Sequence, residues 1–245
     1  MKKLLSFGLV LLLGIGLLCG CGKNVTPTDN PGQPSSEGTK ASTTASGDAD
    51  TDYFTWDEDT ITGLTDIGKE QTELIIPDTA KSIGMSAFLG DTNLIKVSLG
   101  VGLEEIGEGA FYMCKSLTEV SFPDSLKKID SSAFYFCESL VTVNFSDSGG
   151  LVEIGDNAFA MCKILEKIEL PEGLTILGKS AFYPCIKINS VYLPVSLENI
   201  PANVFGLKTD AIVYVKEGSW ADLHYSEFAP NFAYSEDPMY VKSYY

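Results

Sequence analysis

Residues 117–139 read LTEVSFPDSLKKIDSSAFYFCES, and this 23-residue unit recurs along most of the chain. Each copy is marked by a small residue followed by phenylalanine, at Ala87-Phe88, Ala110-Phe111, Ala133-Phe134, Ala158-Phe159, Ala181-Phe182 and Val204-Phe205. The marker phenylalanines are 23 residues apart, except for one interval of 25. Such regular spacing is typical of repeat architectures, in which each copy forms one structural unit.

The order of residues within the unit predicts one coil of a solenoid. Val120 and Phe122 lie two positions apart, which puts both side chains on one face of a strand, and Pro123 ends that strand. A second extended stretch reaches Ile129, and Ala133-Phe134 is expected to form a short helix or 3-10 turn that closes the coil. One coil cannot bury its own apolar face, whereas stacked coils share a core. The sequence therefore predicts a curved right-handed stack with a spine of phenylalanines, each contributing about 1.5–3 kcal/mol when buried.

The interval of 25 residues has a local cause. Ser146 to Gly150 replaces the usual proline link and adds two residues to one coil. Because loop length costs little free energy, we expect a bulge that the stack tolerates.

The pattern LxxVxxPxxLxxIxxxAFxxC resembles the BspA-like class of bacterial leucine-rich repeats. The resemblance covers about residues 60–218; residues 60–88 resemble the way such arrays begin, and residues 212–225 are similar to their closing segment. It implies a leucine-rich-repeat solenoid in a surface or secreted protein, of a kind often implicated in adhesion and host contact. The resemblance names no ligand.

Solenoid ends need caps, and the sequence predicts one at each end of the repeats, which occupy residues 73–218. In the N-terminal cap, residues 53–72, two apolar stretches flank Asp57-Glu58-Asp59 and are expected to pair as a hairpin. In the C-terminal cap, residues 219–245, Ser219 and Asp222 fit a capping box at the start of a helix.

The helix of the C-terminal cap is expected to place Trp220, Leu223 and His224 on one face. The rest of this cap is rich in aromatic residues, namely Tyr225, Phe228, Phe232, Tyr234, Tyr240, Tyr244 and Tyr245. We interpret it as an irregular cap, with an aromatic ligand site as the alternative.

Residues 1–21 read MKKLLSFGLVLLLGIGLLCGC and have the form of an export signal. Two lysines precede an apolar run from Leu4 to Leu18, which is the length of a signal-peptide core and too short for a comfortable transmembrane helix. The end of this run resembles the bacterial lipobox, which implies that residues 1–20 are a lipoprotein signal peptide and that Cys21 bears the lipid. Diacylation would anchor the chain stably in the membrane. A simple cleaved signal is the alternative.

Residues 21–52 begin with the lipid-bearing cysteine and are otherwise rich in Thr, Ser, Gly, Pro and Asp, with almost no large apolar side chain. Such a segment cannot offset the entropy of ordering, so we expect a disordered tether. A flexible chain of this length has an r.m.s. span of roughly 30 Å, which would hold the folded part clear of the membrane.

The charge of the chain excludes several classes of partner. Seventeen lysines, no arginine and 33 acidic residues give a net charge of −16, and loss of Lys2 and Lys3 with the signal peptide brings the mature chain near −18. This field repels nucleic acid, and no arginine is present to read guanine or phosphate. Bare anionic lipid headgroups are disfavoured for the same reason.

Four cysteines stand three residues after a marker phenylalanine, at Cys114, Cys137, Cys162 and Cys185. Equivalent positions in successive coils point the same way, which favours buried free thiols that pack as small hydrophobic groups. Adjacent coils lie roughly 5 Å apart, so bridges from Cys114 to Cys137 and from Cys162 to Cys185 are the alternative. A metal site is a third interpretation, although no histidine or CxxC accompanies these cysteines.

The sequence offers little for catalysis. His224 is the only histidine, and its place in the cap helix favours a structural role. Asp57-Glu58-Asp59 and Glu104-Glu105 lack the spacing of calcium ligands or of a catalytic carboxylate pair, so we interpret them as solvated charge. No phosphate loop or dinucleotide fingerprint occurs. We therefore expect neither an enzyme nor a bound metal or cofactor.

The predicted strands carry the candidate ligand-binding residues, because the positions between buried apolar residues point to solvent. One such column is Ile75, Ser98, Ser121, Asn144, Glu169, Tyr192 and Tyr214. Seven strands in one sheet would span roughly 30 Å, enough for a protein segment or a glycan. Tyr192 and Tyr214 are neighbours in the predicted ladder, and exposed aromatic side chains are common binding anchors. An inert solvated sheet is the alternative.

These features together predict a lipid-anchored protein on the outside of a bacterial cell. Its solenoid would bind an extracellular protein or glycan, and its only contact with the membrane would be the lipid on Cys21. The alternative is a structural envelope or spacer protein without a specific ligand.

Overall fold

A computed structural model of the 245-residue chain describes residues 51–207, 211–228 and 241–243. The chain divides into two compact units, Met1–Ala45 and Ser46–Tyr245, and every described residue lies in the second. The predicted signal peptide, Cys21 and the tether up to residue 50 lie outside the described residues, as does most of the aromatic C-terminal segment. The described part contains no helix that is long and apolar enough to span a membrane.

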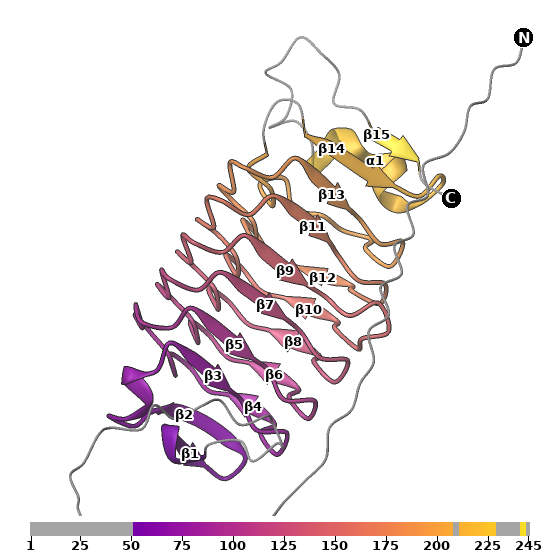
Figure 1. The fold of residues 1–245 in the computed structure, drawn as a ribbon. Coiled ribbons are helices and arrows are strands. Elements are labelled where there is room, and N and C mark those ends of the chain that lie inside the picture. The colour runs from indigo at the N-terminus through magenta and orange to yellow at the C-terminus, as the bar shows by residue number, and fades with distance from the viewer. Residues whose placement is uncertain (1–50, 208–210, 229–240, 244–245) are drawn as a thin grey trace, which may run out of the picture. The chain divides into compact units, whose positions relative to one another are not determined.

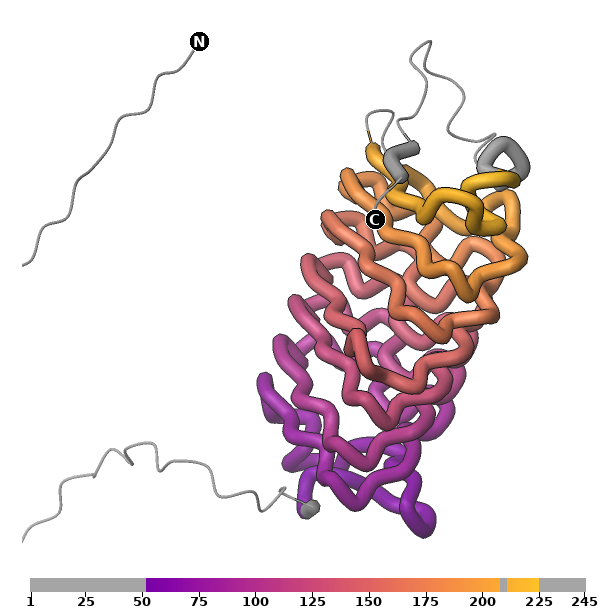
Figure 2. The backbone as a smooth tube through the Cα atoms, turned by 90° about the vertical axis from the view of Figure 1, so that its right-hand side faces the viewer, coloured from indigo at the N-terminus to yellow at the C-terminus, as the bar shows by residue number. Residues whose placement is uncertain are grey.

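The second unit is a solenoid in which successive coils contribute strands to two rows (Figure 1). One row is a seven-stranded sheet, and all its strands after the first are parallel. Its strands are β1 Phe54–Asp57, β2 Thr60–Leu64, β4 Ser82–Ile83, β6 Glu105–Ile106, β8 Lys128–Ile129, β10 Glu153–Ile154 and β12 Ile176–Leu177. Figure 2 shows the same coils, turned by 90°, stacked one on the next.

The other row, which we call the strand face, contains β3 Glu73–Ile75, β5 Lys96–Ser98, β7 Glu119–Ser121, β9 Thr142–Asn144, β11 Lys167–Glu169, β13 Ser190–Tyr192, β14 Ile212–Val215 and β15 Val241–Ser243. Because the repeat length is nearly constant, the register pairs equivalent positions of successive coils, such as Leu74 with Val97 and Val191 with Val213.

The strand face is not the single sheet that the sequence suggested. It consists of two four-stranded sheets, one from β3 to β9 and one from β11 to β15. The interruption falls in the coil that carries the two added residues. Ser146 and Ser148 donate hydrogen bonds to the Asp124 carboxylate of the preceding coil. These bonds hold the segment after β9 toward that preceding coil, and the ladder to the next coil is lost at this point.

The Ala-Phe segments are turns and do not continue into helices, which corrects the helical form of the prediction. Tyr112 N donates to Gly109 O at 2.9 Å, whereas Phe111 N donates to Ala133 O of the next coil at 2.7 Å. Alternate amides thus close a turn or bond to the next coil. The residue before the alanine has a positive φ, 60° at Gly109 and 57° at Ser132. A helix needs every residue in the right-handed region, so this residue prevents one.

The predicted phenylalanine spine is confirmed. Its six rings stack along the solenoid with centroid distances of 4.9, 4.9, 5.0, 5.1 and 5.7 Å between successive coils. Phe122 meets Phe134 edge-on at 5.7 Å. All six spine residues are buried, and one continuous hydrophobic cluster runs from the N-terminal hairpin to the first turn of the C-terminal helix. The core is therefore shared by all the coils, as the repeat argument requires.

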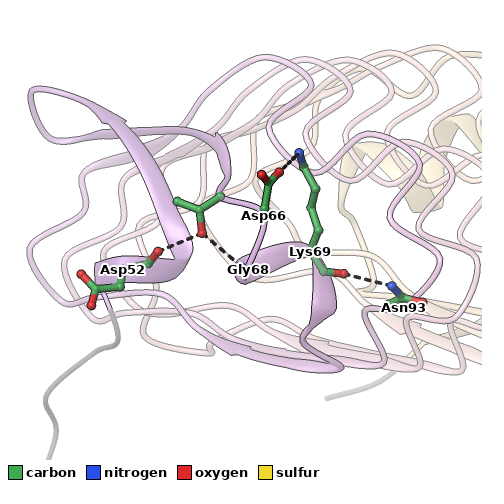
Figure 3. Close-up of polar contacts among 6 residues, drawn as sticks. Asp52, Asp66, Gly68, Lys69 and Asn93 are labelled. Atoms are coloured by element: carbon green, nitrogen blue, oxygen red, sulfur yellow. Dashed lines mark hydrogen bonds and ion pairs between the residues drawn. The ribbon is translucent and has the colours of Figure 1, made fainter.

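The N-terminal cap contains the predicted antiparallel hairpin, in which Phe54 pairs with Leu64 and Asp57 with Thr60. Two 3-10 helices, η1 Thr51–Tyr53 and η2 Gly68–Glu70, complete it. Thr65 joins them, because its hydroxyl donates to Asp52 O at 2.9 Å and accepts from Gly68 N at 3.1 Å (Figure 3). Asn93 Nδ2 then donates to Lys69 O at 2.9 Å and ties η2 to the first coil (Figure 3).

At the other end, helix α1 spans Trp220–Phe228. Ser219 Oγ accepts from Asp222 N at 3.3 Å, and an Asp222 carboxylate oxygen accepts from Gly218 N at 2.8 Å. This is the predicted capping box with one difference. The Asp222 side chain is shorter than the usual glutamate, and it accepts from the amide of Gly218 instead of the amide of the N-cap residue Ser219. The His224 ring stacks on Trp220 at 4.5 Å, and its Nδ1 lies 2.9 Å from Trp220 O. The only histidine thus packs within its own helix.

Candidate functional site

The strand face exposes the residues that the alternation predicts. In β3, β5, β7, β9 and β11 the middle residue is buried and the two flanking residues are exposed. In β13 and β14 the outward residues are half-buried. The break between β9 and β11 divides the predicted column into Ile75, Ser98, Ser121 and Asn144 on one sheet and Glu169, Tyr192 and Tyr214 on the other.

Tyr192 and Tyr214 form a stacked pair at the centre of the second sheet. Their ring centroids are 4.2 Å apart and the rings are nearly parallel, at 7°. The Lys167 ammonium lies 5.3 Å from the centre of the Tyr192 ring and pairs with the Glu169 carboxylate at 2.5 Å. One face of Tyr192 is therefore covered by Tyr214, and Lys167 lies against the ring as well. The pair can present ring edges and hydroxyl groups to a partner.

The same neighbours set the protonation of this cluster. Partial burial, and then the hydrogen bond with Tyr214, raise the pKa of Tyr192 above its ordinary value of 10.0. The hydrogen bond to Glu169 raises the pKa of Lys167 above 10.5. Near neutral pH Tyr192 is therefore neutral and Lys167 is charged, which allows a cation–π contact.

The first sheet of the strand face is more polar. Asn144 Nδ2 donates to Glu119 Oε1 and to Ser121 Oγ, both at 3.0 Å. Ile75, at the N-terminal edge, is 62% exposed and is the one large apolar side chain in this half of the predicted column. The aromatic anchors of the strand face thus belong to its C-terminal half.

The edge of the seven-stranded sheet carries a charge ladder that the sequence analysis missed. Glu104 lies between Lys81, at 3.6 Å, and Lys127, at 2.5 Å. The hydrogen bond from Lys127, then its charge, lowers the pKa of Glu104. These three residues are 23 positions apart, so the repeat length would have revealed the ladder. The charges are exposed and each such pair contributes little to stability.

A second aromatic feature was also missed, because it lies on the turns. Tyr112 and Tyr135 stack at 5.0 Å and 13°, and Lys163 lies 5.2 Å from the centre of the Phe136 ring. The three aromatic residues follow the marker phenylalanines by one or two positions, and Lys163 follows Phe159 by four.

The four cysteines of the repeats are buried free thiols, as predicted, and no bridge joins them. Each thiol donates to the carbonyl oxygen of the marker phenylalanine one coil earlier, at distances of 3.1 to 3.3 Å. Burial raises the pKa of all four thiols, to about 12 for Cys114 and Cys185. A thiol with so high a pKa is a poor nucleophile, so these cysteines serve the core.

Asp57-Glu58-Asp59 lies in the hairpin turn, where Glu58 has a positive φ of 54°. Within residues 51–207, 211–228 and 241–243, no group of three or more His, Cys, Asp or Glu residues is arranged to hold a metal ion. The strand face carries the residues that the sequence predicts as ligand-binding.

Coils that contribute strands to two rows and a turn to a third, around a phenylalanine spine, define a bacterial leucine-rich-repeat solenoid. Six copies of the family described as BspA type leucine rich repeat region match residues 68–164 and 144–213, which is more than half of the chain. The chain belongs to this family. A comparison with curated proteins found none that matches.

Solved structures of similar proteins agree with this assignment. A T. pallidum leucine rich repeat protein is 31% identical with a TM-score of 0.58, over 63% of this chain and 72% of that chain. A leucine-rich repeat protein from Bacteroides ovatus is 25% identical with a TM-score of 0.50, over 66% and 52%. A leucine rich cell surface protein from Faecalibacterium prausnitzii is 24% identical with a TM-score of 0.51, over 69% and 55%, and shows the fold alone. This chain spans about half the length of the last two.

Proposed function

We propose that this chain is a bacterial surface lipoprotein, anchored through Cys21, whose strand face binds an extracellular protein or glycan. Its ligand-binding column is Ile75, Ser98, Ser121, Asn144, Glu169, Tyr192 and Tyr214. The observation that carries the proposal is the stacked pair of Tyr192 and Tyr214 beside Lys167 on the strand face. Family membership supports it, because repeat solenoids use such extended surfaces for binding.

The geometry of the tyrosine pair favours a polypeptide over a sugar ring. Sugars are held against the open face of an aromatic ring, whereas here the faces of Tyr192 are occupied by Tyr214 and approached by Lys167. Two rigid side chains with outward edges and hydroxyls resemble the aromatic anchors of protein interfaces. Lys167 and Glu169 supply charges that can fix the orientation of a partner.

We also propose that this chain has no catalytic role. The described thiols are buried and protonated, and the histidine is stacked on Trp220. A net charge of −16 disfavours nucleic acid and anionic lipid as partners. The partner is accordingly an extracellular protein or, as the second ligand class, a glycan.

Arrays of extracellular proteins and glycans, probed with the purified chain, test this function. We expect a saturable interaction that the double variant Tyr192→Ala/Tyr214→Ala weakens by at least 2 kcal/mol, about thirtyfold, because such anchors dominate interface energies. Tyr112→Ala/Tyr135→Ala is the matched control, since it removes a similar stacked pair from the turns and should leave the affinity unchanged.

Unchanged affinity of the strand-face variant would exclude this surface as the binding site. No saturable ligand on either array would favour the structural spacer instead. The anchor is tested separately by labelling cells with palmitate. The label should appear on the wild-type chain and be lost in Cys21→Ser, and a labelled Cys21→Ser chain would exclude Cys21.

A further inference from the structure

The hydrogen-bond ladder of the turns is directional, and the first coil leaves it open. Each coil donates amides to carbonyls of the next, as in Phe88 N to Ala110 O at 2.8 Å and Gly90 N to Tyr112 O at 2.7 Å. The equivalent carbonyls of the first coil belong to Ala87 and Leu89, and they point toward the N-terminal end. Among the described residues no donor reaches either oxygen. Two acceptors therefore face the cap without a donor from residues 51–207, 211–228 or 241–243.

Asp91 adds a third acceptor at the same place. It occupies the slot that holds a cysteine in the next four coils, where the thiol donates to the phenylalanine carbonyl one coil earlier. No marker phenylalanine precedes the first coil. Asp91 Oδ1 accepts from Asn93 N at 2.9 Å and from Leu94 N at 3.2 Å. Its Oδ2 is buried and has no hydrogen-bond partner within the part of the chain that the structure describes. A buried oxygen without a partner is costly unless something donates to it.

The residues that carry these acceptors, Ala87, Leu89 and Asp91, line a pocket of about 300 Å³ between the cap and the first coil, and the side chains of Leu64 and Leu89 are apolar parts of its lining. Lys69 stands at the same pocket, but its ammonium pairs with Asp66 at 3.2 Å and its carbonyl accepts from Asn93 (Figure 3). The lining thus combines the apolar side chains of Leu64 and Leu89 with residues whose oxygen atoms can accept further hydrogen bonds.

We infer that this pocket binds an alkylammonium group. An ammonium carries three N–H donors, which match the carbonyls of Ala87 and Leu89 and the free Asp91 oxygen. Its alkyl stem would lie along Leu64 and Leu89. The net charge of −16 attracts cations to the molecule. The group can come from a small primary amine or from a lysine side chain of another polypeptide. The site is separate from the strand face and does not depend on the proposed function.

Amide chemical shifts of the ¹⁵N-labelled chain provide the test. The probes are n-butylammonium chloride and the peptide acetyl-Gly-Lys-Gly-amide, with the norleucine peptide as the control that lacks only the ammonium. We expect saturable shifts at Gly90, Asp91 and Asn93 with at least one ammonium probe and none with the norleucine peptide. Binding of the amine alone identifies a small-molecule source, and tighter binding of the lysine peptide identifies a polypeptide.

Asp91→Asn should weaken binding at least about tenfold, because it removes the charge-assisted hydrogen bond. The amide oxygen can still accept from Asn93 N and Leu94 N. Asp78→Asn is the matched control, since Asp78 also accepts a backbone amide, that of Val101 at 3.0 Å. If the spectrum of Asp91→Asn shows an unfolded chain, Asp91→Cys replaces it, because four other coils accept cysteine in this slot.

The inference is overturned if neither ammonium probe gives saturable shifts, or if the norleucine peptide binds equally well. It is also overturned if the folded Asp91 variant binds as tightly as the wild type. Loss of binding in Asp78→Asn as well as in the Asp91 variant would point to general charge attraction and would equally exclude a built site.

Discussion

Truncation of Phe134 to alanine should destabilise the solenoid by about 3–5 kcal/mol, the usual cost of removing a buried phenylalanine. Phe134 is fully buried and its ring contacts Phe111 at 4.9 Å, Phe159 at 5.0 Å and Phe122 at 5.7 Å. Phe205, at the end of the spine, has a ring contact only with Phe182 among the described residues, at 5.7 Å. Two fewer aromatic contacts, at about 0.5–1.5 kcal/mol each, make Phe205→Ala about 1–3 kcal/mol less costly.

Urea unfolding, followed by circular dichroism, measures these differences in the free energy of unfolding. Tyr135→Ala is the control, because Tyr135 adjoins Phe134 in the chain but is only half-buried. The reasoning would be refuted if Phe134→Ala cost no more than Tyr135→Ala, or if the central and terminal spine positions cost the same. A lower m-value for Phe134→Ala alone would instead indicate that the coils on either side unfold separately.

Thiol reagents at pH 8 should label the four buried cysteines in urea but not in the folded chain, because burial keeps the thiols protonated. The four residues are Cys114, Cys137, Cys162 and Cys185. Equal labelling rates in both states would contradict this prediction. As the folded pKa of Cys114 and Cys185 is about 12 against an ordinary 9.0, the unfolded state ionises first. Stability is therefore unaffected by these thiols below pH 9 and falls between pH 9 and 12, and Cys114→Ala should make the measured fall shallower. Gly109→Ala should cost about 1–2 kcal/mol in urea unfolding, since φ is +60° but the new methyl group has room. Gly178→Ala should cost more stability than Gly109→Ala, because the new Cβ would lie 2.3 Å from Asp156 N. A smaller loss of stability for Gly178→Ala than for Gly109→Ala would contradict the close packing of the coils at Gly178.

The features predicted correctly from the sequence are those in which one coil repeats another. The 23-residue spacing places Phe88 beside Phe111 and Cys114 beside Cys137 in successive coils, so burial in one coil implies burial in the next. The alternation in β3 to β13 likewise follows from the two-residue period of a strand. The hairpin and the capping box depend on neighbouring residues, which short-range rules describe well.

The candidate site was predicted only in part. Tyr192 and Tyr214 are neighbours because the register follows from the repeat, and the structure stacks them. The position of Lys167 beside the ring depends on rotamers that no spacing specifies. The break between β9 and β11 was missed. It falls in the coil where Ser146 and Ser148 donate hydrogen bonds across to Asp124, and the repeat spacing does not specify such contacts.

The coil, its length, the spine and the column of thiols follow from the repeat alone, because stacking equivalent coils brings the same apolar positions together in one core. How the two ends of that stack are finished depends on contacts that the repeat does not specify. An amide ladder has a direction, so the first coil must present acceptors where every later coil is satisfied by its predecessor. Whether the cap covers those acceptors or leaves a pocket at Asp91 depends on contacts between residues that are far apart in the sequence, such as Lys69 and Asn93.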